Sequence, residues 1–344
     1  MRKRALCTAL AAVMLLLAAC GTTAPQPENS EPKGMVYYSF FDTVTYVYSY
    51  ANDSAERFEG LSADCAHILK EYHQLFDIYH EYEGMNNLCT LNRNAGKAPV
   101  ELDERLIAFL EEAKNLYYET GGEMNVMLGS VLSLWHDARE DGSYVPGDEE
   151  LSEAAEHTDI ESLVIDGSSV CITDEKASID VGAFGKGYAT EQAAKHLEEQ
   201  GADSYVLNVG GNIRIVGTKP DGSGWKTGIK DPFDPNASTA AKITISDTSC
   251  VTSGIYERYF TVDGQRYHHI IDKDTLHPSE HFASVTVVVK DSGIADALST
   301  ALFCMTEEEG TALAEKYGAE VLWIRPDGTQ SMTPGLGEYI EETA

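Results

Sequence analysis

The spacing of apolar residues changes near the start of the chain. Residues 35–50 (MVYYSFFDTVTYVYSY) are dense in aromatic and β-branched side chains, which is typical of a β-strand. Between residues 53 and 83, apolar side chains recur every three or four positions, which predicts one face of a long helix. The members of this stripe are Phe58, Leu61, Cys65, Leu69, Tyr72 and Phe76.

Further helices and a hairpin are expected in the next part of the chain. Residues 101–122 predict a second helix, which Asp103 can cap and the glycine pair Gly121-Gly122 can end. Residues 148–157 have a weaker helical pattern. Residues 162–172 (SLVIDGSSVCI) predict a hairpin that turns at the DGS sequence.

The second half of the chain mixes the two kinds of element. Residues 177–201 predict a strand, a tight turn and a helix, and residues 204–217 predict a strand pair. Several strands follow as far as residue 262. The last elements are a strand at 284–289, helices at 291–305 and 307–318, and a strand at 319–324. Because helices and strands do not alternate regularly, the pattern favours the α+β class over a doubly wound parallel sheet.

The first residues have the pattern of an export signal. A basic start (MRKR) precedes a short apolar run that ends in LAAC, which is typical of a bacterial lipoprotein signal peptide. We expect residues 1–19 to be removed and Cys20 to carry the lipid; an ordinary secretory signal is the alternative. Residues 20–34 then form a polar, proline-containing tether, and residues 35–344 form the functional domain.

The charge of the chain restricts its partners. There are 56 acidic and 25 basic residues, a formal net charge of −31, and loss of the signal peptide removes three bases and no acid. Such a surface repels nucleic acid and anionic lipid headgroups. An anionic ligand therefore needs a metal ion or a well-placed cation. The cysteines after Cys20 are isolated and odd in number; most suit buried positions, and a disulfide stays open.

A glycine-rich turn is the first candidate site. In IDVGAFGKGY (179–188) glycines surround Lys186 shortly after Asp180, and a helix follows. Glycines let a ligand approach the backbone, and a helix N-terminus presents free N–H groups to an anion. The spacing matches neither GxGxxG nor a P-loop. The alternative is a plain tight turn between strand and helix.

A second candidate site lies in ADALST (295–300). On a helix, Asp296 and Thr300 are one turn apart and share a face. A carboxylate and a hydroxyl are hard oxygen donors that suit Mg²⁺ better than zinc. The alternative is that both residues only cap the helix.

The sequence RYHHIIDKDTLHP (266–278) adds a candidate base. Neighbouring histidines on a strand point to opposite faces, so only one of His268 and His269 can enter a given site. A histidine can accept a proton near neutral pH. Ser253, in VTSG, is a weak nucleophile candidate because no GxSxG motif surrounds it.

The order of the motifs resembles that of one bacterial family. Asp42-Thr43 is followed by LFDIYHEYEGMNNLCTLN, TGGEMN, IDVGAFGKGY, LNVGGN, VTSGIYERYF, HHIID and ADALSTALF. This series resembles the ApbE family, the FAD:protein FMN transferases of bacterial cell envelopes, over residues 37–325. The resemblance implies an α+β fold, with a T-fold-like mixed sheet core, a second lobe, and FAD bound between them.

The resemblance also implies roles for individual residues. Asp180 and Lys186 would contact FAD, and the carbonyl of Ala183 would hold Mg²⁺ together with Asp296 and Thr300. The remaining positions that would line the flavin nucleotide or the reacting phosphate are Tyr82, Glu123, Met124, Asn125, His269 and Ile270. We expect His269 to be the general base, with Asp180 or Asp272 as alternatives.

The implied reaction moves FMN from FAD to a Ser or Thr hydroxyl of another protein and releases AMP. The expected acceptors are flavoproteins of the cell envelope, such as subunits of membrane redox complexes, and the enzyme would be lipid-anchored on the extracytoplasmic face of the cell membrane. Two alternatives stay open: a Mg²⁺-dependent FAD pyrophosphatase that releases FMN and AMP, and a flavin-binding lipoprotein without catalysis.

Overall fold

The computed structural model describes residues 32–234, 236 and 238–341. The expected signal peptide, Cys20 and most of the expected tether lie outside the described residues. Lys33 and Gly34, at the end of the expected tether, instead belong to the first strand, β1 (Lys33–Phe40). Within the described ranges, no helix is long and apolar enough to cross a membrane.

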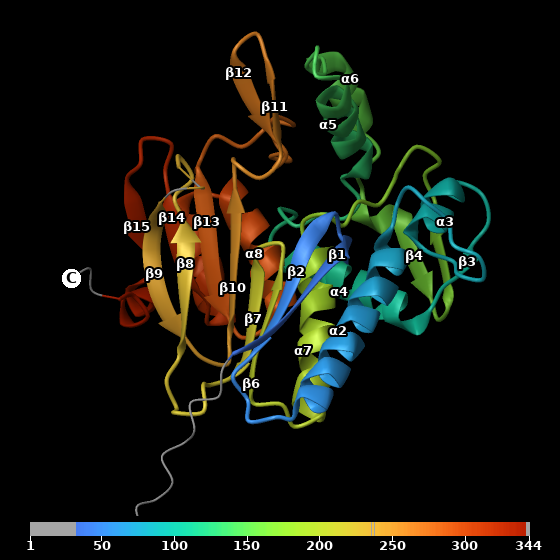
Figure 1. Cartoon of the computed structure of the whole chain (residues 1–344). Helices are drawn as coiled ribbons and strands as arrows, with labels where there is room; N and C mark the ends of the chain where they lie inside the picture. The colour runs from blue at the N-terminus through green and yellow to red at the C-terminus, as the bar shows by residue number, and fades with distance from the viewer. Residues whose placement is uncertain (1–31, 235, 237, 342–344) are drawn as a thin grey trace, which may run out of the picture. The chain divides into compact units, whose positions relative to one another are not determined.

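The largest sheet in the described part of the chain has eight antiparallel strands in the order β1-β2-β6-β7-β10-β13-β14-β15 (Figure 1). Besides β1, its members are β2 (Thr43–Ser49), β6 (Ser204–Val209), β7 (Asn212–Gly217), β10 (Ser249–Gly254), β13 (Ser284–Val289), β14 (Glu320–Ile324) and β15 (Gln330–Met332). An antiparallel sheet with helices grouped beside it is an α+β architecture, which confirms the class predicted from the sequence.

The two faces of this sheet bury different partners. One face is covered by the helices α2 (Ala55–Phe76), α7 (Gly185–Glu199) and α8 (Ser292–Cys304), with α9 (Glu307–Tyr317) against α8 (Figure 1). The opposite face packs against the hairpin of β8 (Trp225–Lys230) and β9 (Thr239–Ile245). Successive side chains of β6 point to opposite faces of the sheet. Leu207 therefore packs in the core on the helical side, and Val206 packs in the core under the hairpin.

A second lobe is built from the chain between α2 and α7. Its elements are α3 (Leu88–Arg93), β3 (Val100–Glu101), α4 (Glu104–Glu119), α5 (Gly129–Asp141), α6 (Asp148–Ala155), η1 (Ile160–Ser162), β4 (Leu163–Asp166) and β5 (Ser169–Ile172), with a small sheet in the order β3-β5-β4. The hairpin of β11 (Tyr259–Val262) and β12 (Gln265–His268) reaches across to α5, where Trp135 lies 5.9 Å from the ring of Tyr267 (Figure 1). A short turn, η2 (Pro334–Glu338), follows β15.

Several predicted elements are confirmed. Asp103 caps α4 by accepting a hydrogen bond from the N–H of Arg105, and both glycines after α4 have positive φ. The weak helix at 148–157 is α6, and the DGS sequence joins β4 to β5. The five cysteines of the described residues are free thiols, so no disulfide forms among them.

Two predicted boundaries are wrong. Residues 35–50 form a hairpin rather than one strand, because the chain reverses at Phe41 and Asp42, both with φ of 52°. The long helix ends at Phe76, since Asp77 takes an extended conformation. The sequence analysis also missed α3 and α5.

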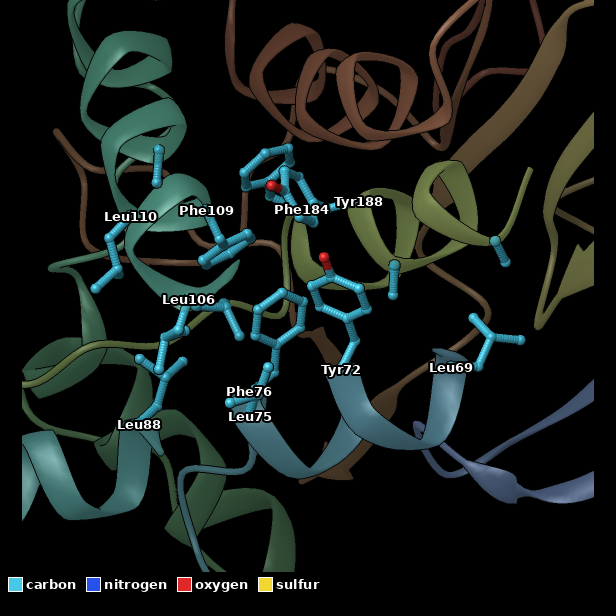
Figure 2. Packing of buried hydrophobic residues seen from close by; sticks show 14 of the residues in the cluster. Leu69, Tyr72, Leu75, Phe76, Leu88, Leu106, Phe109, Leu110, Phe184 and Tyr188 are labelled. Atoms are coloured by element: carbon cyan, nitrogen blue, oxygen red, sulfur yellow. The ribbon is translucent and has the colours of Figure 1, made fainter. Parts of the chain in front are cut away.

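Aromatic side chains join the two lobes (Figure 2). Phe109 of α4 lies 4.2 Å from Phe76 of α2 and 4.9 Å from Phe184, measured between ring centroids. Tyr188 of α7 packs edge-on against Phe109 at 5.1 Å. Since Phe184 belongs to the glycine-rich turn, the core holds this turn from within.

The helices α7 and α8 are in close contact at Gly187. A Cβ atom at this position would lie 2.4 Å from the Cβ of Asp296 and 2.4 Å from the carbonyl oxygen of Ser292. The N–H of Gly187 donates to Oδ2 of Asp296 at 2.7 Å. Only a residue without a side chain fits this crossing.

We therefore expect Gly187→Ala to lower the free energy of unfolding by about 1–3 kcal/mol, because the added methyl group forces the two helices apart. Urea denaturation followed by circular dichroism measures the change. The matched control is Gly60→Ala inside α2, where no heavy atom lies within 4 Å; there the loss of backbone freedom in the unfolded chain should raise stability by about 0.5–1 kcal/mol. If both variants gained stability, the close crossing would be refuted.

Candidate functional site

The glycine-rich turn is held in place by the second lobe. The side chain of Asn92 pairs with Ile179 on both sides, accepting from its N–H at 2.8 Å and donating to its carbonyl at 2.9 Å. The N–H of Asp180 donates to the carbonyl of Val126 at 2.9 Å. Oδ1 of Asp180 accepts from the N–H of Gly182 at 2.8 Å, so this carboxylate lies over the turn itself.

Lys186 lies where three elements meet. Its Nζ donates to Oδ1 of Asn212 at 2.5 Å and lies 3.8 Å from Oδ1 of Asp296. Asn212 starts β7 just after the turn made by Gly210 and Gly211, both with positive φ. The motifs GKG, NVGGN and DALST, far apart in the sequence, therefore form one cluster.

The expected metal ligands also lie together. Asp296 is only 5% exposed, and Thr300 follows it by one turn of α8. Oγ1 of Thr300 lies 3.5 Å from the carbonyl oxygen of Ala183 and 3.4 Å from Oγ of Ser253. Ser253 in turn bonds to the hydroxyl of Ser299 at 2.8 Å, so its hydroxyl supports α8.

The donor set fits magnesium held jointly with a phosphate. All three donors are hard oxygens, as Mg²⁺ prefers, and only one of them is a carboxylate. Among residues 32–234, 236 and 238–341 there is no group of three His, Cys, Asp or Glu that could hold a metal ion alone. Mg²⁺ usually keeps several waters and binds through one or two carboxylates plus substrate phosphates, which agrees with this sparse set.

The two neighbouring histidines diverge, as the strand geometry predicts. Nε2 of His268 lies 3.0 Å from the carbonyl oxygen of Ser279, and its ring packs against Phe303 at 5.7 Å. His269 is exposed, and both its N–H and its Nδ1 lie 3.1 Å from the carbonyl oxygen of Arg258. Because a carbonyl can only accept, Nδ1 carries the proton and Nε2 presents its lone pair outward.

The surroundings of His269 favour its neutral form. Protein atoms surround the ring closely although solvent still reaches it, and this loss of hydration, followed by the charge of the Arg258 guanidinium, lowers the pKa of the imidazole well below its ordinary value. A neutral imidazole with a free Nε2 can accept a proton, but a base with so low a pKa is weaker than an ordinary histidine.

Asp272, one of the two alternative bases, is already engaged in hydrogen bonds. Asp272 is 8% exposed, and its Oδ1 accepts from the N–H groups of Asp274 and Thr275, both at 2.8 Å. These bonds close the IDKD turn. Oδ1 of Asp272 therefore already accepts two hydrogen bonds, whereas the ring of His269 is bonded through Nδ1 and leaves Nε2 for a proton.

The side chains of the expected flavin-lining segment all have partners within the protein. Met124 is 1% exposed, and Nδ2 of Asn125 donates to the carbonyl of Thr158 at 3.0 Å. Glu123 lies 3.2 Å from Nζ of Lys273. Burial raises the pKa of Glu123 although this ammonium group opposes the shift.

Ile270 and Tyr82 are also held by their own surroundings. Ile270 is 4% exposed in the core beside α8. The hydroxyl of Tyr82 donates to Oδ2 of Asp77 at 2.8 Å, and partial burial together with this bond raises its pKa to about 12. The roles of both residues toward FAD stay predictions.

Sequence reasoning missed Tyr79, three residues before Tyr82. Tyr79 is 54% exposed, and its ring lies 5.5 Å from that of His136 on α5. Partial burial raises the pKa of the Tyr79 phenol, and the carboxylate of Asp180 raises it further. Tyr79 is thus an exposed aromatic side chain of this segment whose phenol pKa is affected by a carboxylate of the glycine-rich turn.

Two arginines were missed as well. The charges of Arg258 and Arg139 contribute to the lowered pKa of His269, and the same two charges oppose the rise in the pKa of Tyr79. Arg139 was overlooked because α5 was not predicted. The apolar spacing in SVLSLWHDA, where Val131, Trp135 and Ala138 are buried, was the available signal.

Comparisons with known proteins agree with this arrangement. A sequence model described as the ApbE family matches residues 41–323. A FAD:protein FMN transferase of Vibrio cholerae is 32% identical over 317 residues, with 91% of each chain covered. One of Treponema pallidum is 34% identical over 270 residues, with 74% of each chain covered.

Solved structures show the same fold. The ApbE protein of Thermotoga maritima superposes with a TM-score of 0.81 at 26% identity, covering 91% of this chain and 100% of the other. The flavin transferase ApbE of Vibrio cholerae superposes with a TM-score of 0.77 at 28% identity, covering 90% and 99%. The family match spans most of the chain and both lobes, and the chain therefore belongs to the ApbE family.

Proposed function

We propose that the chain is a Mg²⁺-dependent FAD:protein FMN transferase, which moves FMN from FAD to a Ser or Thr hydroxyl of an exported or membrane flavoprotein. The observation that carries the proposal is the cluster of Lys186, Asn212 and Asp296, one helical turn from Thr300. It combines a cation and hard oxygen donors at the end of a glycine-rich turn, as a pyrophosphate substrate requires in so acidic a chain.

The residues support a direct displacement at phosphorus. The acceptor hydroxyl oxygen forms a bond to the FMN-side phosphorus of FAD, the bond from that phosphorus to the bridging oxygen breaks, and AMP leaves with this oxygen. The hydroxyl proton passes to Nε2 of His269. Lys186 neutralises charge on the phosphate oxygens, and Asp180 orients the turn over which the pyrophosphate lies.

A metal ion would share this work. Ala183, Asp296 and Thr300 would hold Mg²⁺, which supplies further stabilisation of negative charge on the phosphate oxygens when bound.

The first test uses FAD, Mg²⁺ and an exported acceptor protein. Mass spectrometry should show the mass of FMN added to the acceptor, with one AMP released per FMN transferred. Asp296→Ala should reduce transfer by at least about a hundredfold, because one carboxylate supplies most of the charge in the donor set. The control is Glu308→Ala on the exposed side of α9, which should transfer at the native rate.

Other outcomes would favour the alternatives. AMP and FMN released at the same rate without acceptor would identify a FAD pyrophosphatase. FAD binding without any AMP, unaffected by Asp296→Ala, would identify a flavin-binding protein without catalysis.

A second test concerns the base. His269→Ala should reduce transfer about a hundredfold to ten-thousandfold, the usual contribution of a general base, while FAD binding stays within about twofold of native. His67→Ala on α2, whose side chain is 71% exposed, is the matched control and should have no effect.

The pH dependence follows from the lowered pKa of His269. Above this pKa the imidazole is neutral, so its protonation should not slow transfer as the pH falls from about 8 to about 6. A loss of rate centred near pH 6.5, present in the native enzyme and absent in His269→Ala, would show an ordinary histidine pKa and contradict this description.

We also propose that the enzyme is lipid-anchored through Cys20 on the extracytoplasmic face of the cell membrane, where it meets acceptor flavoproteins. Support comes from the LAAC sequence after the apolar run. In Cys20→Ala, we expect any protein that has lost its signal peptide to appear in the soluble fraction, and the remainder to keep the signal peptide. Fractionation measures the location, and intact mass shows whether the signal peptide is present. Full membrane retention of a cleaved Cys20→Ala protein would refute the anchor.

A further inference from the structure

A buried ion pair joins the same two elements, α7 and β7, that carry Lys186 and Asn212. Arg214 of β7 has an exposed fraction of 0% and Glu191 of α7 one of 4%, and Nε of Arg214 donates to Oε2 of Glu191 at 3.0 Å. Arg214 also donates from Nη2 to Oε1 of Glu198 at 2.7 Å. None of these groups belongs to the residue set proposed for FAD or Mg²⁺.

Glu191 connects this pair to α8. Its Oε2 accepts from the N–H of Ser292, the first residue of α8, at 2.8 Å. Glu191 follows Gly187 by about one turn of α7, and Ser292 precedes Asp296 by about one turn of α8. The two helices are therefore joined by two hydrogen bonds one turn apart, Gly187 to Asp296 and Ser292 to Glu191.

The strand β7 contacts α7 near both of these hydrogen bonds. Asn212 and Arg214 are two residues apart on one face of β7. Asn212 accepts from Lys186, next to Gly187, and Arg214 binds Glu191 about one turn further along α7. Because Glu191 and Glu198 lie about two turns apart on α7, the guanidinium group of Arg214 holds this helix at two points along its axis.

We propose that Glu191 and Arg214 are positioning residues, which set the register of α7 against α8 and β7 and thereby the spacing of Lys186, Asn212 and Asp296. The proposal rests on the proposed function, since that cluster is its site.

The chemistry of the pair supports this role. A buried ion pair costs desolvation energy, and well-packed apolar residues often hold a fold together equally well. Charged hydrogen bonds, however, fix direction as well as distance. The pair is thus better suited to fixing the alignment of two helices than to adding stability.

The first variant is Glu191→Gln in the full-length chain. Glutamine keeps the shape and an oxygen that can accept from Ser292 but removes the charge that pairs with Arg214. Deuterium exchange of a peptide spanning residues 183–190 should become at least about threefold faster, since α7 is less firmly aligned. The Mg²⁺ concentration that half-saturates FAD binding, measured by flavin fluorescence, should rise about tenfold.

Two further variants separate alignment from charge. Arg214→Lys keeps the positive charge, so the Mg²⁺ concentration that half-saturates FAD binding should rise less than in Glu191→Gln. In Arg214→Met this concentration should rise at least as much as in Glu191→Gln. The double variant Glu191→Gln/Arg214→Met should exceed Arg214→Met in melting temperature, because it leaves no unpaired buried carboxylate at Glu191. It should not recover the Mg²⁺ requirement.

The matched control for general destabilisation is Ile229→Ala on β8, a residue 2% exposed on the opposite face of the sheet. It should lower the melting temperature and leave the Mg²⁺ requirement of FAD binding and the exchange of residues 183–190 at their native values. If Glu191→Gln behaves like Ile229→Ala, with a lower melting temperature and native Mg²⁺ requirement, the pair is only structural and the proposal is overturned.

Failure of the proposed function gives a different result. If the native protein binds FAD with Mg²⁺ but transfers no FMN, the transferase assignment fails, while the exchange and binding measurements still decide the role of the pair.

Discussion

The approach of α7 to α8 at Gly187 is the contact on which the candidate site depends. The backbone of one helix lies against the Cβ of Asp296 in the other, and the N–H of Gly187 bonds to the same carboxylate. This single contact brings Lys186, which precedes the glycine, beside Asp296. It also leaves the second carboxylate oxygen directed toward the ammonium group, 3.8 Å away. A larger residue at position 187 would push α7 away from α8. It would thereby increase the distance between Lys186 and Asp296.

Local charge matters more here than the net charge of −31. A field that attracts a pyrophosphate must be made by the few cations that the fold places at one point. Lys186 is one, held by Asn212 and a single carboxylate, and Arg258 and Arg139 are others whose charges lower the pKa of His269. Because the donor oxygens of Ala183 and Thr300 are neutral, a metal ion held there as proposed would keep most of its charge for the substrate. The rest of the acidic surface then acts at longer range and is screened by salt.

The parts predicted from the sequence are those governed by local rules. Helices with a regular apolar stripe or a capping residue, such as α4 after Asp103, were found because those signals lie within one segment. The β1–β2 hairpin was missed since Phe41 is not a usual turn residue, and Asp42 is a single turn signal inside a run of aromatic and β-branched residues. The pairing of Lys186 with Asn212 joins segments whose closeness depends on the sheet order, which no local pattern contains. The motif resemblance identified these segments, but it did not single out Tyr79, which lies inside one of the quoted motifs, or Arg139, which lies outside them.

The hairpin of β11 and β12 couples the geometry of His269 to its chemistry. The carbonyl of Arg258 receives the backbone N–H of His269 and faces Nδ1 of the same ring, so one oxygen ends the strand pairing and selects the tautomer. The guanidinium group of the same arginine lowers the proton affinity of the ring. A movement of this hairpin would therefore change both the direction of Nε2 and its basicity. The packing of Tyr267 on Trp135 of α5 opposes such a movement. The second lobe therefore influences the position of the His269 ring through the hairpin, separately from the cluster of Lys186, Asn212 and Asp296.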